Sequence, residues 1–599
     1  MDLRPVARCL TLRAGSRLVA VALLAAAAAL APAADAAETN LSKREATAIA
    51  ARDAKVADQR AQHPGLEPTA ALEGADWKVD FLAGGDSVAQ VIVDDTTGTV
   101  RESWTGEQVA WKMARGYPGT FGHKLNAPYV WLPLCALFLL GLVDWRRPWR
   151  VANLDLLVLL SFGVSHLLFN RAEIGLSVPL AYPPLLYLLG RMLWIGWRGR
   201  GDGLRPVWPA TWLMIAALFL LGFRGGLNVA DSGVIDVGYA GVVGADRVVD
   251  GKTLYGEGAF PADVGSGDTY GPVNYYAYVP FEQALPWSGS WDDLPAAHAA
   301  AIFFDLATFL GLVLLGRRLR PGEEGKLIGA ALGFAWAAYP YTDFVLQSNS
   351  NDSLVALLLV GLLLLLARPT ARGATLALAG ATKFAPLILA PMMATYRAAP
   401  REQEDSSGRS AGGAEGAIPA TRGAPRARAG NVSSVTGPAA VRFGAGFVVA
   451  ALLVMLPTVI HPGLGTFWDR TITNQIDRDS PFSVWGQVGG LEPLRIALIA
   501  ALGLLSLVLA LRPRHKSAVQ VAALAAALLI GTQLIAQHWF YLYIVWFLPA
   551  LLVALAAVSP RLEQEPARSS PPGPRRRSTP PRPSPTRLPR RSRSEPASA

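Results

Sequence analysis

Twelve apolar segments, most of them long enough to cross a lipid bilayer, constrain the fold of this chain more than any other feature. A helix that crosses a hydrocarbon core of ~30 Å needs about 20 residues. Hydrophobic residues make up 52% of the 599-residue chain and charged residues only 17%, whereas soluble domains carry about 25% charged residues. The sequence therefore predicts an all-α polytopic membrane protein. The apolar segments lie at residues 129–145, 154–170, 174–195, 208–224, 296–316, 327–343, 353–367, 373–396, 441–460, 491–511, 517–536 and 539–558.

The basic residues of the chain gather in short loops between these segments and in its last residues. The loop clusters are DWRRPWR, RGRGDGLRP, GRRLRPGEEGK, ARPTARG and RPRHK, and we expect all of them on the cytoplasmic side. This distribution explains the net charge of +10 without a nucleic-acid partner. Cys9 and Cys135 are the two cysteines, so the sequence predicts no disulfide framework. No Walker loop, HExxH or CxxC motif occurs, and we expect neither a metal nor a cofactor.

The first 115 residues predict an export signal followed by a small extracytoplasmic module. Residues 1–36 combine an arginine-rich start, the apolar run Leu18–Ala31 and the small-residue site Ala34-Asp35-Ala36, which is the pattern of a secretory signal peptide. An uncleaved first transmembrane helix is the alternative. Residues 41–115 predict one helix over SKREATAIAARDAKVADQRAQ, followed by strands over DWKVDFL and SVAQVIVDDTTGTVRESW, with a turn at DDTTG.

The segment 373–396 decides the topology of the predicted transmembrane domain at residues 128–560. Counting spans from either end places residues 398–440 on the cytoplasmic side only if this segment enters the membrane and returns. Gly380, Pro386 and Pro391 break its helical pattern around Lys383, and broken helices at membrane depth line cavities. Residues 398–440 and the tail at 561–599, which holds ten arginines, are rich in Gly, Pro and Ser and predict disordered cytoplasmic segments. The basic tail is expected to contact membrane lipids.

An acidic, aromatic-rich loop from Leu227 to Trp287 is the predicted mouth of an active site. Ten carboxylates lie between Gly226 and His298, against only Arg247 and Lys252. Asp231 and Asp236 follow the predicted helix 208–224 and could act as general bases toward an acceptor hydroxyl. A solvated loop carboxylate or a helix cap is the alternative for each. The loop continues with Tyr239 and closes with the run Tyr270-Gly271-Pro272-x-Asn274-Tyr275.

Basic side chains near this mouth predict contacts to an anionic substrate. Lys383 lies in an apolar segment and needs an anion, which could be a donor phosphate, Asp343 or Asp352. Snorkelling of its ammonium to the surface is the remaining alternative. Arg470 and Arg478, with Asp479, form a cluster in the outer loop 461–490 and suit phosphate recognition. A surface ion pair that orders the loop is the alternative. Gln537 and His538 lie at the outer end of segment 517–536, beside aromatic residues typical of the membrane interface.

Several motifs resemble known families. Residues 41–115 loosely resemble a PepSY-like module, through Trp77-x-Val79 and Asp95-x-x-Gly98-x-Val100. The run Asp236-x-x-Tyr239, the stretch Gly251-Lys-Thr-Leu-Tyr255 and the turn into the next helix resemble the polyprenol-phosphate-mannose-dependent mannosyltransferases of glycosyltransferase family 87, in the GT-C superfamily. Further patches that fit are Gln347-x-Asn349, AGATKFAPLILAP, RDSPFSVWG and QHWFYLYIVWFLPAL. Together they cover residues 208–558. The resemblance departs upstream, where three predicted helices and the module precede the aspartate.

The resemblance implies a multi-pass glycosyltransferase of the cell membrane that works on the extracytoplasmic side. The donor would be a polyprenyl-phosphate sugar, most often mannose, and the acceptor a lipid-linked or cell-wall glycan. Asp236 would be the base. Two other classes stay open. One is a lipid or polyisoprenoid transporter or flippase, and the other is a non-catalytic scaffold or sensor with the same fold. The implied substrate-binding residues are Tyr239, Tyr270, Asn274, Gln347, Asn349, Lys383, Arg470, Arg478 and His538.

Overall fold

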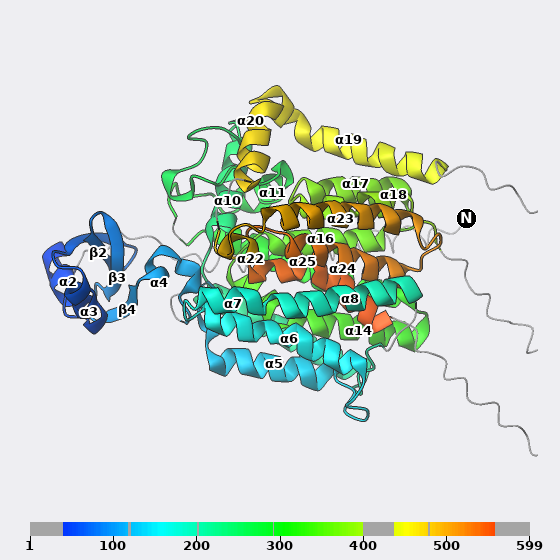
Figure 1. The fold of residues 1–599 in the computed structure, drawn as a ribbon, viewed down its shortest axis with the longest axis horizontal. Coiled ribbons are helices and arrows are strands. Elements are labelled where there is room, and N and C mark those ends of the chain that lie inside the picture. The colour runs from blue at the N-terminus through cyan, green and yellow to red at the C-terminus, as the bar shows by residue number, and fades with distance from the viewer. Residues whose placement is uncertain are drawn as a thin grey trace, which may run out of the picture. The chain divides into compact units, whose positions relative to one another are not determined.

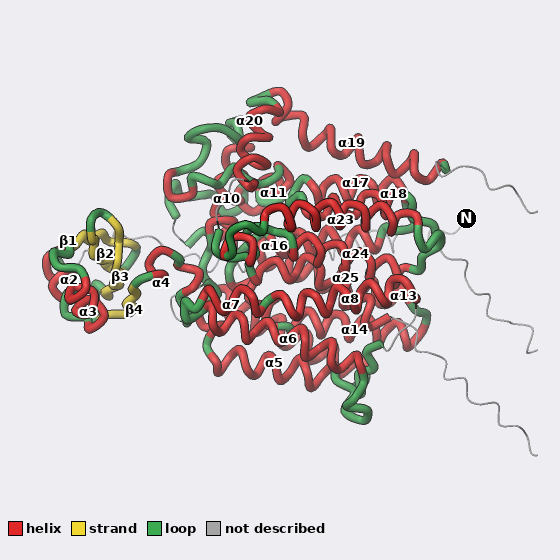
Figure 2. The backbone as a smooth tube through the Cα atoms, viewed as in Figure 1, coloured by secondary structure: helices red, strands yellow, loops and turns green. Residues whose placement is uncertain are grey.

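The computed structural model is mostly helical, with one small four-stranded sheet near the N-terminus (Figures 1 and 2). It describes residues 40–117, 121–199, 203–291, 293–398, 437–476 and 480–557. The predicted signal peptide, nearly all of the 398–440 loop, the basic tail and Arg478 lie outside the described residues. The predictions made for those segments therefore stay predictions.

The N-terminal module is an antiparallel sheet in the order β1-β2-β3-β4, packed against two helices. Alternate residues of β2, namely Trp77, Val79 and Phe81, face the helices and are buried with Ala46 and Val56, as the period of two in a strand requires. A tight turn joins β3 to β4 at the predicted position. Its elements are α2 (Lys43–Ala50), α3 (Ala54–Gln62), β1 (Glu67–Glu73), β2 (Asp76–Ala83), β3 (Asp86–Asp94) and β4 (Val100–Thr105), followed by α4 (Glu107–Ala110), η1 (Lys112–Ala114) and η2 (His123–Asn126).

Two details of the module differ from the sequence prediction. The single predicted helix is two helices, because Asp53 caps the second one by accepting a hydrogen bond from the Lys55 N–H at 2.9 Å. Strand β1 was not predicted, since its sequence EPTAALE has a proline at its second position and no clear alternation of apolar residues. At the β3–β4 turn, the backbone N–H of Thr97 and then the Arg101 side chain lower the pKa of Asp94 to about 2.

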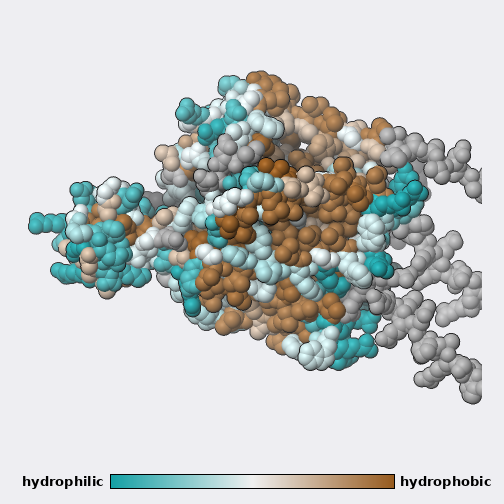
Figure 3. All heavy atoms as spheres, in the orientation of Figure 1, coloured by the Kyte–Doolittle hydropathy of each residue, from teal (hydrophilic) through white to brown (hydrophobic). Residues whose placement is uncertain are grey.

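Six helical stretches in the described part of the chain are long and apolar enough to cross a membrane. They are Val151–Phe169, Ile174–Arg198, Ala210–Asp231, Pro295–Leu319, Pro438–Ile460 and Glu492–Leu511. Shorter apolar helices accompany them. Large apolar side chains are exposed along these helices, including Phe219 at 72% and Leu453 at 69%, and Figure 3 shows them over the middle of the bundle with hydrophilic residues at its ends. Such an apolar belt is typical of a multi-pass membrane protein.

The helices of the bundle form three groups along the chain, which include the six long stretches named above. The first group is α5 (Pro128–Leu142), α6 (Val151–Phe169), α7 (Ile174–Leu180), α8 (Tyr182–Arg198) and α9 (Ala210–Asp231). The second is α13 (Pro295–Leu319), α14 (Gly322–Ala338), α15 (Pro340–Gln347), α16 (Asp352–Leu364), α17 (Pro369–Gly380), η4 (Ala385–Leu389) and α18 (Ala390–Ala394). The third is α19 (Pro438–Ile460), α20 (Leu464–Trp468), η6 (Asp469–Thr473), α21 (Asn474–Ile476), α22 (Val484–Gln487), α23 (Glu492–Leu511), α24 (Ala518–Leu534), η7 (Tyr541–Tyr543) and α25 (Ile544–Ala557).

The segment 373–396 doubles back on itself, as predicted. Helix α17 runs to Gly380, the chain turns at residues 381–384, and η4 and α18 return beside α17. The guanidinium of Arg372 near the start of α17 lies 5.1 Å from the ring of Tyr396 after α18. A Cβ placed on Gly380 would lie 2.3 Å from Leu387, so the two limbs are in direct contact. The membrane side on which they begin stays a prediction.

Basic clusters from distant parts of the sequence meet at one end of the bundle, which we call the basic end. There the guanidinium of Arg150 donates to the Gly203 carbonyl, and Arg320 donates to the Ala557 carbonyl at 3.1 Å. The Lys516 N–H donates to the Arg397 carbonyl at 3.0 Å. This gathering is what the positive-inside pattern predicts for a cytoplasmic face.

The opposite end, which we call the cap end, carries residues 232–294 and differs from the predicted loop. Helix α9 extends to Asp231, so this aspartate is the last residue of a helix. The region that follows is largely helical, with α10 (Asp236–Val249), η3 (Ala262–Val264), α11 (Pro272–Tyr276) and α12 (Val279–Glu282). Its tyrosines, among them Tyr255 and Tyr275, are buried in a core of its own. This core was not predicted from the sequence, because the region is acidic and the apolar residues of α10 have mostly small side chains.

The contact between α13 and α14 yields a test of the fold. A Cβ on Gly316 would lie 2.4 Å from the Cα atom of Gly329, so Gly316→Ala should separate the two helices and destabilise the protein by about 1–3 kcal/mol. Gly222→Ala in α9 is the control, because a Cβ there meets nothing within 4 Å and alanine favours the helix. Thermal unfolding of the purified chain should show a lower Tm for the first variant alone. Equal Tm values would contradict this packing.

Candidate functional site

Seven consecutive polar residues are fully buried where α15 turns into α16. They are Gln347, Ser348, Asn349, Ser350, Asn351, Asp352 and Ser353, and we call them the polar turn. Burying a polar group without a hydrogen-bond partner costs about 1–3 kcal/mol in proteins. The partners of the polar turn therefore indicate which segments the fold must bring together at the cap end.

Beneath the polar turn, Gln347 is held by a buried ion network. Its amide nitrogen donates to the Arg224 carbonyl at 3.0 Å and to Asp343 Oδ1 at 2.7 Å. The Arg224 guanidinium lies 2.8 Å from Asp305 and 3.3 Å from Asp343. One guanidinium thus faces two carboxylates deep in the bundle. Gln347 adds a hydrogen bond to one of these carboxylates, that of Asp343. The predicted substrate role of Gln347 has no direct support in these contacts.

Asn349 joins the polar turn to the segment that leads into α10. It adopts a φ of +49°, a left-handed conformation that asparagine tolerates better than most residues. Its Oδ1 accepts from Asn228 at 2.9 Å, and its Nδ2 donates to Ser232 Oγ and to the Gly233 carbonyl, both at 3.0 Å. The backbone N–H of Ile235 donates to the Ser348 carbonyl at 3.2 Å. These bonds fix the residues just before α10.

Asp236 is the first residue of α10 and its side chain is exposed. The next turn of the helix packs on the polar turn, since a Cβ on Gly238 would lie 2.3 Å from the Asn349 carbonyl oxygen. A carboxylate at a helix N-terminus is stabilised by the helix dipole. Asp236 therefore stands at the surface of the cap end, directly beside the polar turn.

Asn351 connects the polar turn to α11. Its Nδ2 donates to Asn274 Oδ1, and the N–H of Val273 donates to the Ala381 carbonyl at 3.0 Å, so α11 also touches the 381–384 turn. Among the described residues, Asn274 Nδ2, Asn351 Oδ1 and the Tyr278 hydroxyl are buried without a hydrogen-bond partner. Buried groups of this kind usually bind water or a polar ligand.

Asp352 holds Lys383 in a buried ion pair. The Lys383 Nζ lies 2.6 Å from Asp352 Oδ1, which also accepts from the Trp546 indole at 2.7 Å, while Ser350 Oγ donates to Asp352 Oδ2 at 2.8 Å. The ammonium lies 5.7 Å from the ring of Tyr270, 5.4 Å from Tyr543 and 5.0 Å from Trp546. Of the three anions considered for Lys383, the structure thus provides Asp352.

His538 lies on the aromatic side of this ion pair. Its Nδ1 lies 2.8 Å from Ser480 Oγ, and its ring lies 6.4 Å from that of Tyr543, which stacks on Trp546 at 4.3 Å. Tyr270, Lys383 and His538 are therefore connected through aromatic rings. The structure brings these three predicted residues together with Asn274 and Asn349 around the polar turn.

Three other predicted site residues have separate partners. Asp231 accepts from the Lys124 N–H at 3.0 Å and lies 3.4 Å from its ammonium. Tyr239 is buried against the ring of Trp291 at 4.7 Å. Arg470 pairs with the buried Asp268 through two nitrogens, at 2.6 and 2.9 Å, and this hydrogen bonding raises the pKa of the arginine. Each of these residues thus contacts other parts of the chain, and for Arg470 an ion pair with an aspartate was the alternative that the sequence left open.

Three further members of this site, Asn228, Asn351 and Trp546, were not predicted from the sequence. Asn351 was detectable, because seven polar residues in a row between two apolar helices call for buried partners. Asn228 and Trp546 carried no such pattern, since an asparagine near a helix end and a tryptophan in an apolar helix are both ordinary. In the described part of the chain, no three His, Cys, Asp or Glu side chains are grouped to hold a metal ion.

The chain matches no model of a known protein family and no curated protein sequence. The resemblance to family 87 therefore depends on the motif residues alone. The geometry of the cap end is the independent basis for a function.

Removal of Lys383 tests whether its ion pair is structural. Lys383→Met should destabilise the protein by about 3–5 kcal/mol, because it leaves the carboxylate of Asp352 buried without its cation. The double variant Lys383→Met/Asp352→Asn should recover much of this loss. Thermal unfolding measures both. If Lys383→Met keeps the wild-type Tm, the ion pair does not stabilise the fold.

Arg470 offers a second test, on the order of the cap. Arg470→Gln strands the buried Asp268 and should loosen residues 256–268, which the Asp268 carboxylate contacts at the Gly256 N–H. Hydrogen–deuterium exchange in this segment should then be at least about tenfold faster, as local opening becomes easier. Arg495→Gln is the control, because its partner Glu492 is 54% exposed. Similar exchange in both variants would show that the Asp268 pair does not order the cap.

Proposed function

We propose that this chain is a membrane glycosyltransferase that moves a sugar from a polyprenyl-phosphate donor to an acceptor hydroxyl. The observation that carries the proposal is the placement of Asp236. It is an exposed carboxylate beside a buried polar turn, at the end of the bundle opposite the basic end. The same aspartate opens the motif that resembles family 87.

The proposed reaction is a direct displacement at the anomeric carbon. Asp236 accepts the proton of the acceptor hydroxyl as its oxygen attacks that carbon. The bond between the anomeric carbon and the phosphate oxygen breaks, and the polyprenyl phosphate leaves with the electron pair. The product has the inverted configuration. Because the phosphate is a good leaving group, the step requires no cofactor from the protein.

The rings around Lys383 provide a surface suited to a sugar. Tyr270, Tyr543 and Trp546 are grouped on one side of the polar turn, and Asn274 Nδ2 and Asn351 Oδ1 lie nearby without partners among the described residues. Aromatic faces with a few hydrogen-bonding groups are typical of small-molecule sites. We propose mannose as the sugar and a lipid-linked or cell-wall glycan as the acceptor, as the family resemblance implies.

A lipid or polyisoprenoid transporter is the second candidate, and the Arg224 network favours it. Charged side chains inside a membrane bundle often mark a transport pathway, and here two carboxylates face one guanidinium. A transporter would move the donor across the membrane with its sugar intact. A scaffold that lacks catalysis would do neither.

Replacement of the proposed base gives the most direct mutational test. Asp236→Asn should lower the rate of sugar transfer by roughly 10²–10⁴, as expected for loss of a general base, and should leave Tm and donor binding unchanged. Asp250→Asn is the control, since Asp250 lies at the other end of α10 in a surface pair with Lys252. Transfer of radiolabelled mannose from polyprenyl-phosphate-mannose measures the rate. Wild-type activity in Asp236→Asn would remove Asp236 from the mechanism.

A further inference from the structure

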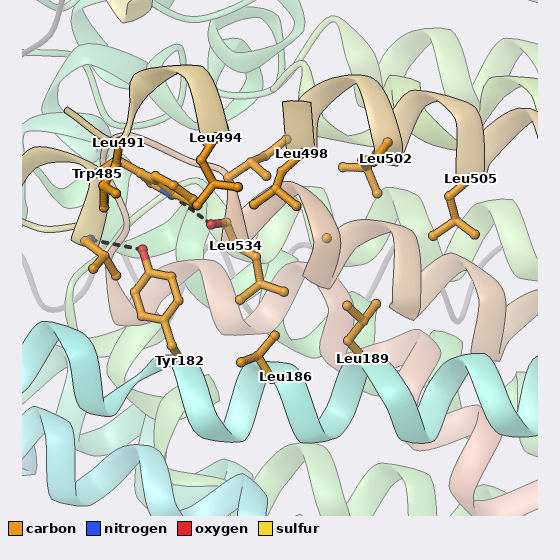
Figure 4. A pocket seen from close by; sticks show the side chains of 14 residues that line it. Tyr182, Leu186, Leu189, Trp485, Leu491, Leu494, Leu498, Leu502, Leu505 and Leu534 are labelled. Atoms are coloured by element: carbon orange, nitrogen blue, oxygen red, sulfur yellow. Dashed lines mark hydrogen bonds between the residues drawn. The ribbon is translucent and has the colours of Figure 1, made fainter. Parts of the chain in front are cut away.

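An apolar groove of about 470 Å³ runs along the bundle between α8, α23 and α24 (Figure 4). Leu491 and the leucines of α23 from Leu494 to Leu505 form one wall, and Leu186 and Leu189 of α8 form the other. Gly531 and Leu534 of α24 lie at its floor. None of the described lining residues carries a charge. The groove is separate from the polar turn and its partners.

The groove opens toward the surroundings of the bundle. Leu186 is 56% exposed, Leu494 51% and Leu498 40%. Two of its walls belong to helices that are long and apolar enough to cross a membrane, Ile174–Arg198 and Glu492–Leu511. The medium beside such helices is lipid hydrocarbon. A hydrocarbon chain is therefore the occupant that the surroundings can supply.

The groove is longer than one leaflet is deep. Leu491 and Leu505 are fourteen residues apart in sequence, which corresponds to roughly 21 Å on a helix. Half of a hydrocarbon core is ~15 Å deep, so the groove is long enough to hold a single acyl chain of one leaflet with its head group near Leu491. Trp485 and Tyr182 lie at that end (Figure 4), at the level where aromatic residues mark the membrane interface.

Among the described residues that line the groove, Tyr182 and Trp485 are the two with polar side-chain atoms. The Trp485 indole donates to the Leu534 carbonyl at 2.9 Å, and the Tyr182 hydroxyl accepts from the Val484 N–H at 3.1 Å. These bonds tie α22 to α24 and α8 and engage both polar side chains. The described lining of the groove is therefore suited to an apolar chain.

We propose that this groove is a binding site for one acyl chain of a bilayer phospholipid. The acyl chain fills a gap that the protein's side chains leave open between α23 and the α8–α24 pair. An unfilled gap would forfeit the van der Waals contacts of its lining, so the lipid acts as a structural part of the bundle. This site is independent of the proposed transferase activity.

Photolabelling of the full chain tests the proposal. The chain is reconstituted into nanodiscs of phosphatidylcholine in which one acyl chain carries a diazirine at its middle, and labelled peptides are mapped by mass spectrometry. Labelling should be at least fivefold denser on residues 494–505 and 182–189 than at Leu453, an exposed leucine of α19. Equal labelling at Leu453 would show ordinary bilayer contact and overturn the site.

A matched pair of variants on α23 adds a second readout. Ala501 lines the groove, and Ala501→Phe should fill it and lower groove labelling at least fivefold. Ala500 is exposed and does not line the groove, so Ala500→Phe should leave labelling within twofold of wild type. Equal labelling in the two variants would overturn the proposal. So would loss of the phosphatidylcholine label when polyprenyl phosphate is added at an equal amount, because the occupant would then be a prenyl chain. If Ala501→Phe does not fold, the wild-type map alone decides.

Discussion

The burial of the polar turn is the constraint on which the cap end of this protein depends. Seven polar side chains between Gln347 and Ser353 have no access to water, and an apolar bundle cannot satisfy them by itself. Three of them find partners on three different segments. Asn349 binds the approach to α10, Asn351 binds α11, and Asp352 binds the hairpin turn at Lys383. The polar turn therefore brings together, at one end of the bundle, the exposed carboxylate of Asp236, the paired ammonium of Lys383 and the three aromatic rings around that ammonium.

Charge pairing identifies three cations near the cap end that hold the fold. Lys383, Arg470 and Lys124 each face a carboxylate of the chain, so none of them presents an uncommitted cation to a donor phosphate. Asp236 lies exposed at a helix N-terminus beside the polar turn. Its exposure and its place in the motif that resembles family 87 are why the proposed chemistry is centred on Asp236. A donor phosphate would have to share Lys383 with Asp352, and an ammonium has three N–H donors with which to do so.

Much of the helical bundle was predictable because hydrophobic length is a strong pattern. The return of segment 373–396 was predicted from the charges around it and from Gly380, Pro386 and Pro391, and the contact of Arg372 with Tyr396 shows that the chain doubles back there. The helical nature of residues 236–249 was not predicted, because acidic composition and small residues resemble a loop. Asp352 was named only as an alternative partner of Lys383, and Asp268 was not named as the partner of Arg470, since a pairing across more than thirty or two hundred residues leaves no local pattern. Side-chain partners of this kind depend on the tertiary fold.

The fate of the bond between sugar and phosphate distinguishes sugar transfer from transport. Polyprenyl-phosphate-mannose, labelled in the sugar, would be supplied to the purified chain in liposomes together with an envelope lipid extract as acceptor. We expect that label leaves the donor and that polyprenyl phosphate is released in an equal amount. An intact donor that only changes leaflet would contradict it, and would identify the chain as a transporter.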